Sequence, residues 1–197
     1  MRLSLVRERL QAFSGREGPA NDPVPEGEAR AAVALILRPR DESTEILFIR
    51  RAEDPRDPWS GHMAFPGGRM DPEDRDAHAT AVRETHEEIG LALDQHAVSL
   101  GPLPDLPAMA RGKRVGLTIS PHVFLLERGT PVLAPNHEVA ETIWADLAPI
   151  AAGELRTSFP YVYEGRSLEL PGHKLGERVV WGLTYHMLES FLGIVRK

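Results

Sequence analysis

The segment AHATAVRETHEEIG, residues 77–90, constrains the fold of this 197-residue chain more than any other. Its apolar spacing predicts a helix. Asp76 is suited to accept a hydrogen bond at the helix N-terminus, and Gly90 is suited to end the helix. Because an α-helix advances about 100° per residue, Val82 and Ile89 fall on one side. The sequence therefore predicts a helix that buries one apolar stripe.

Three glutamates occupy the other side of this predicted helix. Glu84 and Glu88 are four residues apart, so they stack on one face with Glu87 beside them, whereas Ala79 and His86 lie near the buried stripe. Like charges at this spacing repel, and no lysine is interleaved with them. A solvated acidic face is one interpretation. A hard divalent cation such as Mg²⁺, which binds carboxylate oxygens, is the other.

The residues before the helix favour the metal-site interpretation. Residues 52–76 are rich in proline, glycine and charge, and they predict a long loop of the kind that is commonly functional. Within this loop, Phe65 to Gly68 reads FPGG. Paired glycines allow the backbone to turn sharply and to approach another group closely. The combination of this turn with the acidic helix is more specific than either feature alone.

The remainder of the chain predicts helices and strands in alternation, which favours an α/β or α+β fold with a mixed sheet. The expected elements are a helix over residues 2–13, a linker up to residue 28, strands over 31–39 and 44–51, a strand near 97–101 followed by a proline-rich loop, two strands within 115–127 that Pro121 interrupts or borders, a helical start to 138–150 with a strand-like Ile143-Trp144, a hairpin around Glu164-Gly165, and a closing helix over 179–195.

Composition excludes several classes of protein. The chain has 23 Lys+Arg and 29 Asp+Glu, so the formal charge is 23 − 29 = −6, which argues against a nonspecific nucleic-acid binder. It contains no cysteine, which excludes disulfides and thiolate sites and fits a cytoplasmic location. The apolar stretches are too short to span a membrane. No HExxH, Walker A, GxSxG or GxGxxG motif is present.

At this point the sequence resembles a known family. GGRMDPEDRDAHATAVRETHEEIGL, residues 67–91, is similar to the Nudix box, Gly-x5-Glu-x7-Arg-Glu-U-x-Glu-Glu-x-Gly-U, in which U is a bulky aliphatic residue. The matching positions are Arg83, Glu84, Glu87, Glu88, Gly90 and Leu91. Thr85 replaces the first aliphatic residue, Gly68 lies one residue further from Arg83 than the pattern has it, and Arg75 takes the internal glutamate position beside Glu73 and Asp74.

The preceding segment resembles the signature that coenzyme A pyrophosphatases carry before their Nudix box, Leu-Leu-Thr-x-Arg-Ser/Ala-x3-Arg-x3-Gly-x3-Phe-Pro-Gly-Gly. The aligned residues are Leu47, Arg51, Ala52, Arg56, Gly61, Phe65, Pro66, Gly67 and Gly68. Ile49 stands in place of the threonine, and the gap between Arg56 and Gly61 is one residue longer. The two motifs together cover about residues 47–91.

The resemblance implies an α/β/α sandwich with a mixed β-sheet. We expect an N-terminal helix and arm over residues 1–29 and a single Nudix domain over residues 30–197. The implied reaction is metal-dependent hydrolysis of the pyrophosphate bond of coenzyme A or a derivative, which yields 4′-phosphopantetheine and 3′,5′-ADP. The implied cofactor is Mg²⁺ or Mn²⁺. The expected partner is a small nucleotide-type substrate, with no nucleic acid or membrane, and a homodimer is possible.

The resemblance also implies roles for individual residues. The metal ligands would be Glu84, Glu87, Glu88 and Gly68, and the catalytic set would be Glu84, Glu87 and Glu88 with Arg83, which orients a glutamate. The substrate-binding residues would be Arg51, Arg56, Phe65, Gly67 and Gly68.

Several assignments stay open in the sequence. Arg51 and Arg56 have the acids Glu53, Asp54 and Asp57 nearby, so surface ion pairs are an alternative to phosphate binding. Trp59 suits stacking against a base or a pantetheine arm, or plugging of the long loop. Glu138 or Glu141 suits either the reaction or a helix start. The alternatives to a coenzyme A pyrophosphatase are an enzyme for another nucleoside diphosphate derivative, such as a nucleotide sugar, and a sensor that binds nucleotide without hydrolysing it.

Overall fold

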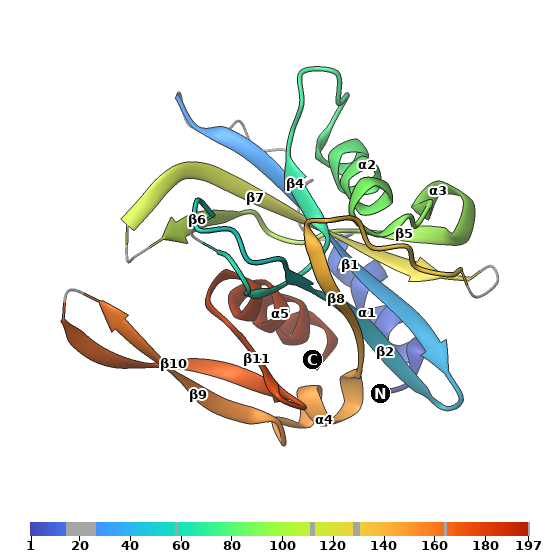
Figure 1. The fold of residues 1–197 in the computed structure, drawn as a ribbon. Helices are drawn as coiled ribbons and strands as arrows, with labels where there is room; N and C mark the ends of the chain where they lie inside the picture. The colour runs from blue at the N-terminus through green and yellow to red at the C-terminus, as the bar shows by residue number, and fades with distance from the viewer. Residues whose placement is uncertain (15–26, 58, 111–112, 128–130, 164, 197) are drawn as a thin grey trace.

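The computed structural model describes residues 1–14, 27–57, 59–110, 113–127, 131–163 and 165–196 (Figure 1). The helices are α1 (Leu3–Ser14), α2 (Ala77–Ile89), α3 (Leu93–His96), α4 (Leu147–Ala152) and α5 (Gly182–Val195). The strands are β1 (Ala29–Arg40), β2 (Ser43–Arg51), β3 (Met63–Ala64), β4 (Gly67–Arg69), β5 (Ala97–Pro102), β6 (Leu106–Ala110), β7 (Lys113–Leu126), β8 (Val139–Asp146), β9 (Arg156–Tyr163), β10 (Arg166–Leu175) and β11 (Arg178–Trp181).

The central sheet is mixed, as the sequence predicts. Its main path has the order β3-β2-β1-β7-β5, and β4, β6 and β8 pair with β1, β7 and β2 respectively. Strands β1 and β7 are parallel, and the other described pairs in this sheet are antiparallel. A separate antiparallel sheet has the order β11-β10-β9, and Figure 1 shows it below α5, away from α2.

Helices cover both faces of the central sheet, so the predicted α/β/α sandwich is confirmed (Figure 1). Alternation along β1 divides its side chains between the two faces, as expected for a strand. Ala32, Ala34 and Ile36 pack on the side of α2 and α3. Val33 and Leu35 pack on the opposite side, in the core that also contains apolar residues of α1 and α5.

Helix α1 confirms the predicted amphipathic helix at the N-terminus. Its Val6 and Leu10 are fully or almost fully buried in the same core as α5. The apolar stripe of α1 is therefore used within the chain. The predicted domain boundary at residue 29 coincides with the first residue of β1, and it stays a prediction. The arm over residues 15–26 lies outside the described residues. Among the described helices, none is long and apolar enough to cross a membrane.

Two of the sequence predictions placed loops where the chain forms short strands. The stretch 52–76 contains β3 and β4, and the proline-rich stretch after β5 contains β6. Pairing with β1, β2 and β7 supplies the backbone hydrogen bonds of these strands. The local composition carried no sign of this pairing because the partner strands are distant in sequence.

The prediction of two strands separated at Pro121 was wrong, because β7 is one continuous strand. Its other edge changes partner at this residue: Ile119 pairs with β6 and His122 pairs with β5. The Pro121 carbonyl accepts a hydrogen bond from Leu103 N at 2.8 Å. A proline, which has no N–H to donate, is tolerated where a sheet ladder is interrupted.

The elements near the C-terminus also correct the sequence prediction. The expected helical start at 138–150 is strand β8, which pairs along β2, and the helix α4 follows it. The expected closing helix begins three residues late, at Gly182, because residues 178–181 pair with β10. The predicted hairpin is confirmed, with Arg166 opposite Tyr163; Glu164 lies outside the described residues.

Candidate active site

A pocket of about 660 Å³ lies where β4, α2, the 52–62 loop and the start of α5 meet. One part of its lining, from β4 and α2, contains Gly67, Gly68, Glu84 and Glu88, and we call it the carboxylate end. Another part, from the 52–62 loop and β11, contains Trp59, His62 and Trp181, and we call it the aromatic end. Most residues of the carboxylate end were predicted from the sequence, and the pocket joins them to residues near the C-terminus of the chain.

Helix α2 is positioned by the two caps that the sequence predicts. The Asp76 carboxylate accepts a hydrogen bond from Ala79 N at 2.7 Å. Gly90 adopts φ 68°, and its N–H donates to His86 O at 2.8 Å. Both caps are confirmed. They fix where the helix begins and ends, and so which residues face the pocket.

The predicted division of α2 into a buried apolar side and an exposed acidic side was wrong in part. Glu88 is only 3% exposed, next to the fully buried Ile89, whereas His86 is exposed. Thr85, at the position of a bulky aliphatic residue, is buried, and its hydroxyl donates to Ala81 O. The buried side of α2 therefore includes a carboxylate, because the chain around Gly67 packs over it.

Two glycines bring the backbone of β4 close to its neighbours. Gly67 has φ 150°, and a Cβ there would lie 2.2 Å from Ala32 O. At Gly68, a Cβ would lie 2.4–2.5 Å from the carboxylate atoms of Glu84. The first glycine is thus required for the close contact between β4 and β1. The second leaves the space in which the Glu84 carboxylate sits.

Glu88 is held by the backbone of the same turn. Gly67 N donates to Glu88 Oε2 at 2.8 Å. The pKa of Glu88 is raised to about 7, chiefly by burial and also by the carboxylates of Glu84 and Glu138, against the lowering effect of the Gly67 N–H and the positive charge of Arg51. A nearby cation would stabilise the charged form of a buried carboxylate of this kind.

Arg83 organises the acidic residues around it. It donates to Asp74 at 3.1 and 2.8 Å, to Glu84 at 2.9 Å, to Glu87 at 3.2 Å and to Arg69 O at 3.0 Å. The Arg83 guanidinium holds the pKa of Asp74 well below its usual range, and Asp74 raises the pKa of Arg83. The expected orienting contact of Arg83 with a glutamate is present.

The role of Asp74, which the sequence left open, is to anchor Arg83. Asp74 also accepts hydrogen bonds from the Thr80 hydroxyl at 2.9 Å and from Asp71 N at 3.0 Å. Glu73 is exposed and does not line the pocket. The acidic stretch before α2 thus contributes one partner for Arg83, which is Asp74. The only signal for Asp74 in the sequence was its place beside Arg75, which takes the internal glutamate position of the Nudix box.

The three glutamates predicted as metal ligands, Glu84, Glu87 and Glu88, all line the pocket, and their role as metal ligands stays a prediction. The Glu87 side chain is 53% exposed and pairs with Arg83. Within the described ranges, no group of three or more His, Asp or Glu side chains is gathered closely enough to hold a metal as it stands. Burial raises the pKa of Glu84, and charge repulsion from Glu87 adds to this rise. Because Mg²⁺ commonly takes one or two carboxylates and keeps several waters, two of these side chains would be enough to hold it.

The two predicted phosphate-binding arginines line the pocket, and each is held by a nearby aspartate. Arg51 donates to Asp57 at 2.8 Å and 2.7 Å. Arg56 is 90% exposed and forms a forked pair with Asp54 at 3.0 and 2.8 Å. The ion pairs expected as one interpretation are present, and phosphate binding by these two pocket residues stays a prediction.

Other predicted residues divide between the floor and the rim of the pocket. Phe65 is 2% exposed and stacks on Phe48 at 5.0 Å, so it supports the floor. Glu138 lines the pocket and is exposed, whereas Glu141 pairs with Arg50 and Arg178 outside it. The pocket is also lined by four residues that the sequence did not assign to it, Trp181, Leu183, Thr184 and Met187; the only signal there was the expected closing helix over 179–195.

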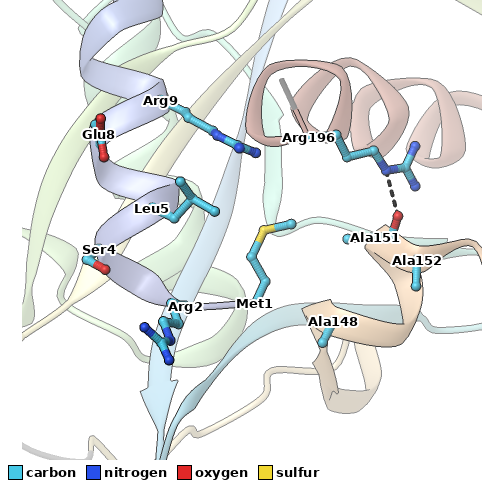
Figure 2. A pocket seen from close by; sticks show the side chains of 10 residues that line it. All are labelled: Met1, Arg2, Ser4, Leu5, Glu8, Arg9, Ala148, Ala151, Ala152 and Arg196. Carbon is cyan, nitrogen blue, oxygen red and sulfur yellow. Dashed lines mark hydrogen bonds between the residues drawn. The ribbon is translucent and has the colours of Figure 1, made fainter.

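A second hollow, about 640 Å³, lies between α1, α4 and the end of α5 (Figure 2). Two of the three arginines that line it hold parts of the fold together. Arg9 donates to Val195 O, and Arg196 donates to Ala151 O and Ile150 O at 2.8 and 3.1 Å. The carboxylates that could do chemistry lie in the first pocket.

A family model of the NUDIX domain matches residues 28–164, which is more than half of the chain. The chain belongs to the NUDIX domain family. The peroxisomal coenzyme A diphosphatase ndx-8 of Caenorhabditis elegans is 34% identical over 128 residues, which cover 62% of this Nudix chain and 51% of that protein. The chain thus spans about half the length of that relative. The Nudix hydrolase NudL of Yersinia pestis is 31% identical over 155 residues, or 79% and 74% of the two chains.

Solved structures agree with this Nudix fold. A MutT/nudix family protein from Enterococcus faecalis has a TM-score of 0.56 at 18% identity, covering 100% of this chain and 71% of that one. A C. elegans Ap4A hydrolase complex has a TM-score of 0.52 at 22% identity, covering 63% and 84%. At these identities the likeness concerns the fold alone.

Proposed function

We propose that this Nudix domain hydrolyses the pyrophosphate bond of coenzyme A or a coenzyme A derivative. The observation that carries the proposal is the pair of half-buried and buried carboxylates, Glu84 and Glu88, at one end of a pocket that also presents Arg51 and Arg56. Carboxylates, a divalent cation and arginines together suit a diphosphate. The coenzyme A diphosphatase of C. elegans and the signature over residues 47–68 support the choice of substrate.

The reaction uses one water. Its oxygen bonds to one phosphorus, the bond from that phosphorus to the bridging oxygen breaks, and the products are 4′-phosphopantetheine and 3′,5′-ADP. Protons are released because each new phosphate ionises. A carboxylate that lines the pocket, that of Glu84, Glu87, Glu88 or Glu138, accepts the proton of the water.

The residues of the chain position the reactants. Glu84 and Glu88, beside Gly68, would hold Mg²⁺ or Mn²⁺, which supplies charge neutralisation of the diphosphate and a more acidic water. Arg83 orients Glu84 and is itself oriented by Asp74. Arg51 and Arg56 exchange their aspartate partners for phosphate oxygens when the substrate binds.

A substrate panel tests this proposal. Coenzyme A, acyl derivatives, ADP-ribose and a nucleotide sugar are assayed with Mg²⁺ and Mn²⁺, comparing the wild type with Glu88→Gln. We expect turnover of coenzyme A by the wild type and loss of it in the variant. Glu73→Gln, which removes an exposed acid outside the pocket, is the matched control and should retain activity.

Two results would contradict the proposal. Turnover of nucleotide sugars but not of coenzyme A would assign a different nucleoside diphosphate derivative as substrate. Binding of nucleotides without turnover of any of them would indicate a sensor.

A cytoplasmic location, the absence of nucleic-acid partners and the possible homodimer stay predictions. The name of the C. elegans relative places that protein in the peroxisome.

A further inference from the structure

The aromatic end of the pocket is built from two distant segments of the chain. Trp59 and His62 come from the loop between β2 and β3, and Trp181 comes from the last position of β11. The rings of His62 and Trp181 lie 4.5 Å apart, centroid to centroid, at an interplanar angle of 54°. Each of the three side chains is partly exposed, so ring surface remains open to the pocket.

The second sheet supports this wall from behind. Phe159 of β9 stacks on Trp181 with centroids 4.3 Å apart and planes at 11°, and Tyr161 lies 5.4 Å from it. Neither Phe159 nor Tyr161 lines the pocket. The buried Thr184 hydroxyl donates to Met63 O at 2.9 Å, which ties α5 to β3. The position of Trp181 is therefore set by packing on one side and by a buried hydrogen bond next to it.

The chemistry of the two ends is opposite. The carboxylate end concentrates charge, whereas the aromatic end contains Trp59, Trp181 and an imidazole. Burial lowers the pKa of His62, so at neutral pH its ring has one N–H donor and one acceptor nitrogen. Planar rings beside a neutral donor and acceptor match a heteroaromatic base, which has stacking faces and polar edges.

We propose that the aromatic end, with Trp181 as its principal contact, binds the nucleobase of the substrate while the diphosphate lies at the carboxylate end. The identity of the substrate rests on the function proposed above. Trp59 and His62 border the same subsite. The hairpin of β9 and β10 contributes through Phe159, which positions Trp181 and does not touch the base.

The two product halves of coenzyme A separate the base from the pantetheine arm. Binding of 3′,5′-ADP and of 4′-phosphopantetheine is measured by calorimetry for the wild type, Trp181→Leu, Trp181→Phe and Trp144→Leu. Trp144 lies under Arg38, outside the pocket, and its variant is the matched loss of an indole. We expect Trp181→Leu to weaken 3′,5′-ADP about 5-fold to 100-fold, and phosphopantetheine less than about twofold. Trp181→Phe should restore most of the affinity.

Other outcomes would contradict either the base subsite or the proposed hydrolysis of coenzyme A, and the two cases can be told apart. Selective loss of phosphopantetheine binding, or equal effects on both ligands, would overturn the base subsite. If Trp181→Leu does not fold, His62→Leu is judged by the same criteria. Wild type that binds 3′,5′-ADP through Trp181 but does not hydrolyse coenzyme A would contradict the reaction alone. Hydrolysis with an unchanged KM in Trp181→Leu would contradict the subsite alone.

Discussion

The two ends of the pocket differ in how they are built. The carboxylate end comes from a single stretch, residues 67–88, in which Gly67 contacts Glu88 and Arg83 contacts Asp74. The aromatic end joins Trp59 and His62, which lie within the part of the chain that the family model matches, to Trp181, which lies beyond the end of that match at residue 164. The geometry of the carboxylate end depends on where α2 begins and ends and on the turn at Gly67. The geometry of the aromatic end depends on how α5 and the β9–β11 sheet dock on the central sheet.

This difference separates two kinds of contribution. Substitutions at the carboxylate end should act on the rate of the chemical step, because its side chains surround the reacting groups. Substitutions at the aromatic end should act on KM, because its side chains contact a part of the substrate that does not react. The predictions below test this separation.

The largest effect is expected for Glu84→Gln. The amide cannot bind a cation as a carboxylate does, so kcat should fall about 1000-fold. Steady-state kinetics with saturating Mn²⁺ measure the effect, and Glu73→Gln should stay within about twofold of wild type. Near-normal kcat in Glu84→Gln would remove this residue from the carboxylate end.

The glycine pair allows stability and chemistry to be separated. In Gly67→Ala, the new Cβ would meet the backbone of Ala32 and Val33 at 2.2 and 2.6 Å, at a φ of 150°. Backbone cannot yield easily, so the free energy of unfolding should fall by about 3 kcal/mol. Urea denaturation measures this change.

In Gly68→Ala, the Cβ would instead meet the carboxylate of Glu84, the flexible end of a side chain. The carboxylate should move, so kcat should fall about 10-fold to 100-fold with little change in stability. The two alanines should therefore have opposite profiles in unfolding and kinetic assays. Similar profiles would contradict the distinct roles of the two glycines.

His122, on the side of the sheet that α2 covers, should make stability depend on pH independently of the pocket. Burial, together with the nearby His78, lowers the pKa of His122 to about 4 from 6.5. The unfolded chain thus binds a proton more readily than the folded one, so stability is lost as the pH falls below 6.5. Between pH 7 and pH 5 this group should remove about 2 kcal/mol.

The pH dependence of urea unfolding tests the role of His122. His122→Phe should flatten the curve between pH 7 and pH 5, whereas His137→Gln, at a side chain that is 90% exposed, should leave it unchanged. An unaltered slope in His122→Phe would assign the pH dependence to other groups.

The smallest effect is expected at Phe159, which supports Trp181 from behind. Phe159→Leu should raise the KM for coenzyme A about threefold at constant kcat, because Trp181 loses a stacked neighbour but remains present. A change in kcat with unchanged KM would break the proposed division between the two ends.

Most of the carboxylate end was predictable because its signals are local. The caps Asp76 and Gly90 and the spacing of Glu84, Glu87 and Glu88 lie within one helix, and helix geometry relates them without reference to the rest of the fold. The strands that were misassigned, β6 and β8, form because distant strands pair with them. The local sequence pattern of a segment cannot predict its pairing with a strand that is distant in sequence.

The sequence by itself determined the family, the acidic helix with its two caps, and the mixed α/β class, since each is encoded in residues a few positions apart. The tertiary structure alone decided that Glu88 is buried, that Arg83 is anchored by Asp74, and that Trp181 reaches the pocket. The contact between Thr184 and Met63, 121 residues apart, shows the physical reason. Burial and long-range contacts arise only when separate elements pack.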